Sequence, residues 1–238
     1  MDWRDEGVLL TVRRHGENAA IIDVFTAEHG RHAGVVRGGA SRKMAPLLQP
    51  GAQLTVEWRA RLEEHLGAYQ FDLARSRAAA LMADGDALAA MGSISALLTA
   101  YLGEREAHPD LYAATVGLLD AIGTAPDWRE AYVGWELMLI ADLGYPLDLS
   151  RCAATGTTEN LVWVSPRSGR AVSAEAGAPF ADKLLEMPAF LRGEDGGAPS
   201  DGLRLTGYFL KHWVAPAFGG HEPPEARARL ADRFAKSR

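Results

Sequence analysis

Residues 1–80 alternate short runs of β-branched and apolar side chains with breaks of glycine and proline. Runs of this length between turn-forming residues are typical of β-strands. The predicted strands span residues 8–12, 20–26, 31–36, 52–59 and 66–73. The turn Glu28-His29-Gly30 joins the second strand to the third as a hairpin. Five strands without a helix between them predict a small β-barrel.

A helical pattern replaces the strands after Arg75. Alanine and leucine dominate residues 78–102, and the apolar positions recur at helical spacing. Asp84-Gly85-Asp86 and Gly92-Ser93 are predicted to divide this stretch into shorter helices. Pro109-Asp110 and Pro126-Asp127 open two further predicted helices, and Gly144-Tyr145-Pro146 ends the second of them.

The last part of the chain is mixed. Two short β-rich runs, 161–165 and 170–173, flank Pro166-Arg167-Ser168-Gly169 and predict a hairpin. Helices are predicted over 180–191 and 203–213, followed by a polar tail after Pro216. The expected fold class is α+β. A barrel domain over 1–78 is followed by a helical domain over 79–238, with a hairpin insertion at 148–179.

Composition places the chain among folded soluble proteins. Of its 238 residues 47% are hydrophobic and 24% are charged, which is ordinary for a globular protein. No apolar run reaches the roughly 20 residues that cross a bilayer. The N-terminus has acidic residues where a secretory signal would be basic, so we expect a cytoplasmic protein without membrane association.

Charge is distributed unevenly along the chain, whose formal net charge is −6. Residues 1–80 carry 11 basic and 10 acidic side chains, residues 81–150 carry 2 and 11, and residues 151–238 carry 12 and 10. A polyanion should therefore meet the first or the last third and avoid the middle.

The window from residue 31 to residue 43 is the best candidate for binding nucleic acid, because it is basic and has no acidic side chain. Glycine here lets a phosphate approach the backbone, and basic strand ends could continue an electrostatic track. The alternative is an ordinary solvated loop. Trp58 and Phe25 could stack on bases, although core packing is the better interpretation for Phe25. The candidate DNA contacts are Arg13, Arg14, Arg31, Arg37, Gly38, Gly39, Arg42, Lys43 and Arg59.

Catalytic and metal motifs are missing from the sequence. Cys152 is the single cysteine, so it cannot form an internal disulfide or hold a structural zinc ion alone. His15, His29 and His32 lack the spacing of a zinc site. There is no Walker-type phosphate loop and no Gly-x-Ser-x-Gly element. We expect a protein that is not an enzyme and needs no cofactor. A metal-dependent nuclease and a protein-interaction scaffold stay open as alternatives.

Two groups of motifs resemble the RecO DNA-repair family over essentially the whole chain. The first group is Gly7-Val8-Leu9, Gly16-Glu17, the run from Asp23 to Arg31, and Val35-Val36-Arg37-Gly38-Gly39. The second is Trp135-Glu136-Leu137, the run from Gly144 to Leu149, Cys152, and the run from Ser165 to Gly169. Together their order and spacing are fairly specific.

This resemblance implies a fold and a role. The fold would be an N-terminal OB-fold, a central helical domain and a zinc-finger-like insertion. The role would be to bind single- and double-stranded DNA at the nucleoid, to anneal complementary strands, and to help load RecA recombinase onto DNA coated by single-strand-binding protein (SSB). RecR and the C-terminal tail of SSB would be the protein partners.

The chain departs from the family pattern at two places. Many relatives carry a Cys-x-x-Cys pair that binds zinc, but here the segment reads Cys152-Ala153-Ala154-Thr155, so we expect a hairpin without metal. A receptor for the acidic, apolar-ended SSB tail needs an apolar pocket with a cationic rim. Basic residues expected just before Trp135 are absent, so a rim from the last third of the chain is the alternative. The residues proposed for this receptor are the cation Arg129 and the apolar residues Trp135, Leu139 and Leu143, and core packing is the alternative for each of the three apolar residues.

Overall fold

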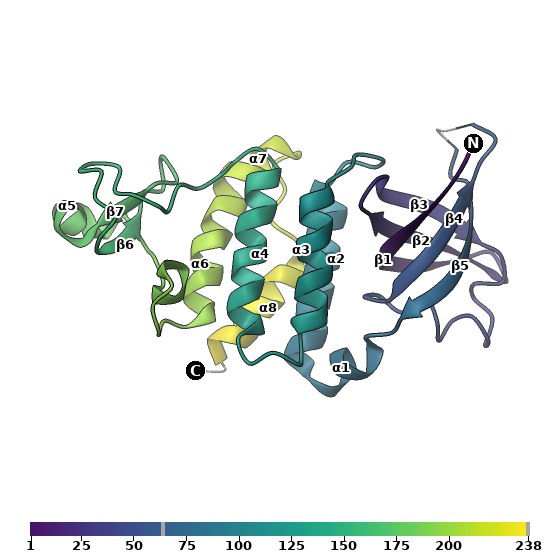
Figure 1. The fold of residues 1–238 in the computed structure, drawn as a ribbon. Coiled ribbons are helices and arrows are strands. Elements are labelled where there is room, and N and C mark those ends of the chain that lie inside the picture. Colours follow the sequence, from purple (N-terminus) through teal and green to yellow (C-terminus); the bar gives the residue numbers. More distant parts are fainter. Residues whose placement is uncertain (63–64, 237–238) are drawn as a thin grey trace. The chain divides into compact units, whose positions relative to one another are not determined.

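The structure is a computed structural model that describes residues 1–62 and 65–236. The chain divides into two compact units, Met1–Ala125 and Pro126–Arg238 (Figure 1). No helix in the described residues combines the length and the apolar character needed to cross a membrane. The predicted α+β class is confirmed, because a β-sheet at the N-terminus is followed by helices.

The first unit begins with strands that close into a barrel. Its described strands are β1 (Asp2–His15), β2 (Ala19–Thr26), β3 (Gly30–Val36), β4 (Gln53–Arg59) and β5 (Ala68–Arg75). Their order around the barrel is β1-β2-β3-β5-β4, with only the β3–β5 pair parallel. All five predicted strands are confirmed, although β1 starts six residues before the predicted residue 8. This early part of β1 pairs with β4, and its polar residues hid it from the hydrophobic pattern.

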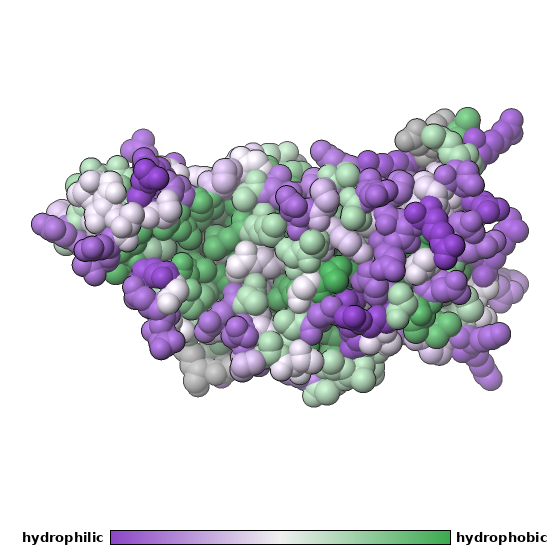
Figure 2. Space-filling model, viewed as in Figure 1, coloured by the Kyte–Doolittle hydropathy of each residue, from purple (hydrophilic) through white to green (hydrophobic). Residues whose placement is uncertain are grey.

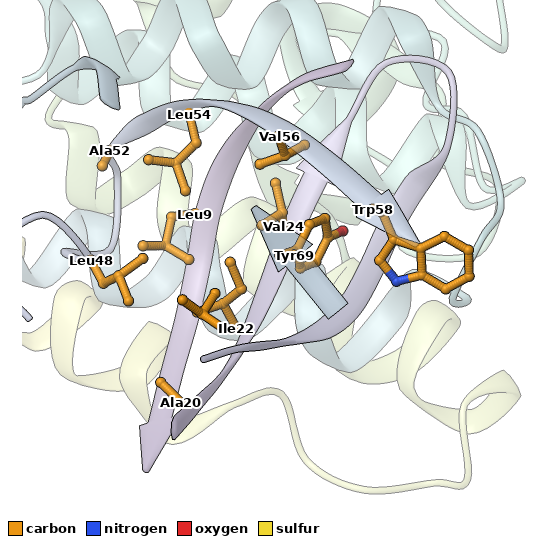
Figure 3. Close-up of a cluster of buried hydrophobic side chains, with 11 residues drawn as sticks. Leu9, Ala20, Ile22, Val24, Leu48, Ala52, Leu54, Val56, Trp58 and Tyr69 are labelled. Atoms are coloured by element: carbon orange, nitrogen blue, oxygen red, sulfur yellow. The ribbon is translucent and has the colours of Figure 1, made fainter. Parts of the chain in front are cut away.

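A cluster of buried apolar side chains fills the barrel. Figure 3 shows Leu9, Ile22 and Val24 from neighbouring strands gathered with Leu54 and Val56, all of them 0% exposed. A shift of register between Leu9 and Thr11 marks a bulge in β1. Bulges bend a strand and let a short sheet close on itself.

Three helices complete the first unit: α1 (Ala78–Ala83), α2 (Gly85–Tyr101) and α3 (Pro109–Ala121). The predicted break at Asp84-Gly85-Asp86 is present, and Asp84 accepts a hydrogen bond from the backbone N–H of Asp86. The predicted break at Gly92-Ser93 is wrong, because α2 runs through it. Ser93 is fully buried, and packing of the surrounding apolar face outweighs the modest cost of one glycine in a helix.

The second unit is built on three longer helices, α4 (Trp128–Asp142), α6 (Pro199–Phe209) and α8 (Glu225–Lys236). A π-helical turn, Leu210–Val214, and the short helix α7 (Ala215–Ala217) continue α6. The expected polar tail after Pro216 is wrong, because α8 forms there. This helix is polar on average but strongly amphipathic, and its apolar side chains Leu230 and Phe234 are buried.

A small sheet in the order β7-β6-β8 belongs to the same unit. Its strands are β6 (Leu161–Val164), β7 (Ala171–Ser173) and β8 (Leu185–Glu186), and the predicted hairpin is β6–β7. The helix predicted over 180–191 is wrong: α5 (Ala174–Gly177) and two short 3-10 turns flank β8 instead. Pro179 and Pro188 interrupt that segment and prevent a continuous helix.

The predicted domains 1–78 and 79–238 divide the chain where strands give way to helices. Contacts group the chain differently, because α1, α2 and α3 belong with the barrel. Tyr112 of α3, for example, packs edge-on against Phe25 of β2, with ring centroids 5.6 Å apart. Arg77, just before α1, donates hydrogen bonds to the carbonyl of Gly51 and to Asp120 of α3.

Candidate nucleic-acid interface

Two arginines lie at the C-terminal end of β1, close to the point where its pairing with β2 ends. Arg13 pairs with Ile21 of β2 and Arg14 pairs with Ala20. Ala20 in turn pairs with Val36, the last residue of β3. Because neighbouring strands lie about 4.8 Å apart, the backbone of Arg14 is about 10 Å from that of Val36. The end of β1 and the start of the loop after β3 therefore meet at one end of the barrel.

The loop between β3 and β4 is fastened to the β1–β2 turn. The backbone N–H of Ala40 donates to the carbonyl of Asn18 over 3.1 Å. Ser41 accepts a hydrogen bond from the N–H of Met44, which starts a helical turn within the loop. Leu48 is 3% exposed and inserts into the barrel core. These contacts give a long loop a defined path beside the arginines of β1.

These two neighbouring segments carry five cations, which we call the basic surface: Arg13, Arg14, Arg37, Arg42 and Lys43. All five are exposed. None forms an ion pair or a side-chain hydrogen bond within residues 1–62 and 65–236, and no acidic residue interrupts the loop from Arg37 to Lys43. Hydrophilic side chains dominate the surface of the barrel in the view of Figure 2. An unneutralised group of this kind attracts a polyanion.

The two glycines of the loop serve different purposes. Gly38 has a φ of +71°, and a Cβ atom there would meet nothing within 4 Å. Its backbone is open to an approaching phosphate. Gly39 faces β2, where a Cβ atom would lie 2.8 Å from the Cβ of Ala20. Gly39 therefore lets the loop pack closely on the strand, and its role is in holding the loop.

Arg31 lies apart from the basic surface in a buried ion pair. Its Nη1 atom is 2.8 Å from Oδ2 of Asp23, and its Nε atom donates to the carbonyl of Leu102. Burial raises the pKa of Asp23, while the guanidinium of Arg31 opposes that rise. A carboxylate already neutralises this arginine, so we leave it out of the proposed DNA contacts.

Arg59 ends β4 on the far side of the β3–β5 pairing. Arg59 pairs with Ala68, which pairs with Val35 of β3. Arg59 is thus two strands away from Val35 in the same row of the barrel. Its guanidinium lies 2.9 Å from the carboxylate of Glu57. An exposed pair of this kind is weak, so Arg59 can exchange Glu57 for a phosphate.

The two aromatic residues considered for base stacking are both buried, Trp58 in the barrel core and Phe25 between the barrel and α3. Phe25 is 0% exposed and Trp58 is 1% exposed. Trp58 also donates its indole N–H to the carbonyl of Leu66. The expectation that Trp58 could stack on bases is therefore wrong, because both faces of its ring are covered by protein.

The residues proposed to receive an SSB tail belong to α4 or follow it, and they do not form an open pocket. Trp135 is 3% exposed and Leu139 is 0% exposed, so core packing accounts for both, while Leu143 is half-buried. The guanidinium of Arg129 lies over the ring of Trp128, 4.7 Å from its centroid.

The second unit instead carries a groove between α6 and α8 that the sequence reasoning missed. Its volume is about 1010 Å³, and small residues such as Gly207 and Ala231 line it. Arg204 and Lys211 border the groove, next to Tyr208. The prediction of a polar tail in place of α8 concealed this feature, although the spacing of Leu230 and Phe234 in the tail is helical.

Sequence models of two related protein families match the chain almost end to end. The model described as "Recombination protein O N terminal" matches residues 1–77, and "Recombination protein O C terminal" matches residues 82–218. The chain belongs to the RecO family. The DNA repair proteins RecO of Roseobacter denitrificans and of Ruegeria sp. strain TM1040 are each 54% identical to it, over 99% of both chains. RecO of Dinoroseobacter shibae is 50% identical over the full length of both.

The zinc site that the RecO resemblance implies does not fit the residues present. Within the residues that the structure describes, no group of three or more His, Cys, Asp or Glu side chains could hold a metal ion. Cys152 is buried, and its Sγ atom accepts a hydrogen bond from the N–H of Ser173 over 3.3 Å. Burial alone would raise the pKa of the Cys152 thiol, but hydrogen bonds from Thr155 and Ser173 outweigh it and lower the pKa to about 6. Hydroxyl and amide groups thus surround the sulfur in this RecO chain.

Proposed function

We propose that this RecO protein is a non-enzymatic mediator of recombinational repair that binds single- and double-stranded DNA through its basic surface. In this proposal it anneals complementary strands and helps load RecA onto SSB-coated DNA at the nucleoid. We also propose that its five-stranded closed barrel is an OB-fold, a barrel type that carries oligonucleotides. The hairpin at 148–179 would be a zinc-finger-like insertion that has lost its metal.

One observation carries the DNA-binding proposal. The hydrogen bond from Ala40 to Asn18 and the Arg14–Ala20–Val36 row bring the β1 arginines beside the β3–β4 loop. This proximity of the two backbone segments supports a shared binding surface for their cations. Contacts from such a surface go to phosphates, so binding should not depend on base sequence.

The net charge of −6 does not oppose this proposal, because binding depends on the positive charges near the basic surface and not on the charge of the whole chain. Screening over roughly 10 Å at 0.1 M salt weakens the effect of the more distant acidic residues, and Glu17 of the β1–β2 turn is an acidic neighbour that the five cations outnumber. Binding should weaken steeply as salt rises, since each neutralised phosphate releases counterions.

The test is binding of a fluorescent single-stranded oligonucleotide at several salt concentrations. We expect the triple variant Arg37→Ala/Arg42→Ala/Lys43→Ala to lose about 10- to 100-fold in affinity and to show a shallower salt dependence. The matched control replaces three exposed cations of the second unit with the same loss of charge, Arg167→Ala/Lys183→Ala/Arg229→Ala. It should bind as the parent does.

Three other outcomes would overturn the proposal. Equal binding by both triple variants would mean that only net charge matters, and no binding by the parent would favour a protein-interaction scaffold. Cleavage of the oligonucleotide with Mg²⁺ would instead support a nuclease. Strand annealing should be measured with and without SSB, because annealing without nucleotide is what a mediator should perform.

RecR and the SSB tail are the proposed protein partners. The groove between α6 and α8 supports tail binding, since it joins an apolar floor to Arg204 and Lys211 at its border. Arg204 pairs with Asp201 at 3.0 Å and Lys211 with Glu222 at 2.8 Å, and these exposed pairs are weak enough to be exchanged for carboxylates of the tail. A fluorescent SSB-tail peptide should bind the parent at micromolar concentration and bind Arg204→Ala/Lys211→Ala several-fold more weakly. Unchanged binding by that variant would exclude this groove, and failure of the parent to bind would exclude the tail as a partner.

A further inference from the structure

A second groove lies within the first unit, between α2 and the barrel. Its volume is about 490 Å³, and its lining is almost wholly apolar. Leu81 and Met91 form part of it on the helical side, and Leu10 and Pro50 form part of it on the barrel side. The DNA-binding proposal makes no use of this groove.

The helical wall of the groove is one exposed stripe of α2. Leu88, Gly92, Ala96 and Ala100 all line it, at a spacing of four residues. Twelve residues of helix span about 18 Å, which is the length of roughly three helical turns of another helix. A Cβ atom on Gly92 would meet nothing within 4 Å, so this stripe admits a close neighbour.

Two large apolar side chains on the groove are left exposed. Met82 is 75% exposed and Leu88 is 55% exposed, an unusual exposure for two large apolar side chains on one groove. A partner that covers them would remove this apolar surface from water.

A positive charge close to the groove favours a partner with acidic side chains. Thr11 lines the groove, and Arg13 follows two residues later on the same face of β1, about 7 Å away. Arg13 is exposed and has no ion pair among residues 1–62 and 65–236. Gln49 and Pro50, which also line the groove on the barrel side, carry no charge. An acidic partner is therefore favoured over a basic one.

We propose that this groove docks an amphipathic helix of a partner protein, whose apolar stripe fills the space along α2 and whose carboxylates face Arg13. An apolar face bordered by charge is the usual chemistry of helix-in-groove recognition. This inference does not require that the protein bind DNA. If it does, the acidic partner and the DNA would compete for Arg13.

Three synthetic peptides of about 16 residues, long enough for four helical turns, test the proposal on the full chain by fluorescence anisotropy. The first has a leucine stripe bordered by glutamates, the second has the same stripe bordered by lysines, and the third scrambles the first. Only the acidic amphipathic peptide should bind at micromolar concentration. Equal binding of the scrambled peptide or the lysine peptide would overturn the proposal.

Two variants locate the bound peptide. Ala100→Leu should weaken binding about tenfold, because the larger side chain occupies the groove. Its matched control is Ala113→Leu on α3, an exposed alanine outside the groove, which should bind as the parent does. Arg13→Glu should weaken binding about threefold, whereas Arg4→Glu on the same strand should not. If Ala100→Leu binds as tightly as Ala113→Leu, the peptide lies elsewhere and the assignment fails.

A failure of the oligonucleotide assay would leave these peptide results unaffected.

Discussion

The backbone N–H of Ala40 donates a hydrogen bond to the carbonyl of Asn18 across 3.1 Å. This contact joins the loop after β3 to the turn that follows β1. It places the loop cations, represented by Arg37, beside Arg13 and Arg14, although more than twenty residues separate the two segments in the sequence. Single substitutions can show what holds this arrangement and the rest of the fold together.

The loop should depend on Gly39 more than on Gly38 for its position. In Gly39→Val the branched side chain would collide with Ala20, so the loop should move and DNA affinity should fall several-fold. Gly38→Ala leaves open space but strains a positive φ, at a cost of about 1 kcal/mol. Oligonucleotide binding and urea unfolding should be measured for both. A Gly39→Val protein that binds DNA normally would show that the loop position is unimportant.

Arg31 should matter for stability. Arg31→Ala leaves the carboxylate of Asp23 buried without its cation, which should reduce the free energy of unfolding by about 3 kcal/mol. The comparison is Arg37→Ala, an exposed cation without an ion pair in the described chain, which should leave that free energy within about 0.5 kcal/mol of the parent. Urea denaturation measures both. Equal stability of the two variants would contradict the structural role given to Arg31.

The helix α8 should be held by the buried pair of Arg227 and Glu136. Arg227 Nη2 lies 3.0 Å from Oε2 of Glu136, whose side chain is 0% exposed. Arg227→Ala should cost about 3 to 5 kcal/mol and accelerate amide hydrogen exchange throughout α8. Arg229→Ala, which removes an exposed pair with Glu225, should cost less than about 0.5 kcal/mol. Slow exchange of α8 in Arg227→Ala would show that Leu230 and Phe234 suffice.

Stability of the Cys152 region should rise with pH. The folded thiol has a pKa of about 6, below the value of 9.0 for an ordinary cysteine. Between these values the unfolded chain holds a proton that the folded chain has lost, so folding becomes more favourable as pH increases. The free energy of unfolding, measured at pH 6 and at pH 8.5, should show this increase. In Cys152→Ser the increase from this group should disappear, and an identical increase would assign it to another residue.

Metal removal should have no effect on the fold. With one cysteine and no candidate ligand cluster in the described residues, the β6–β7 hairpin has no group to bind zinc tightly. Elemental analysis of the purified protein should find no stoichiometric metal, and a chelator should leave the melting temperature unchanged. A metal content near one per chain would contradict this.

The sequence by itself determined the element types wherever the local signal was strong. Alternation of apolar and polar residues predicted the strand Gln53–Arg59, and Pro109-Asp110 marked the start of α3. A strand or helix that buries one face repeats its apolar residues at a fixed spacing. This spacing can be recognised from residues that are close in the sequence. The single cysteine likewise decides against a thiolate zinc site by composition alone, because four thiolates cannot come from one residue. Weaker signals failed: α8 has few apolar residues and was expected to be a tail.

Only the tertiary structure decided which cations are available. Arg31 and Arg37 look alike in the basic window, but Asp23 on the neighbouring strand neutralises one and leaves the other exposed. For Trp135 and Leu139 the sequence left a pocket and core packing open, and the structure shows core packing, while two grooves lie between other elements. Ion pairs, burial and grooves depend on which residues meet across the fold. The sequence lists the residues that take part in these contacts, but it does not show which of them lie next to each other in the folded chain.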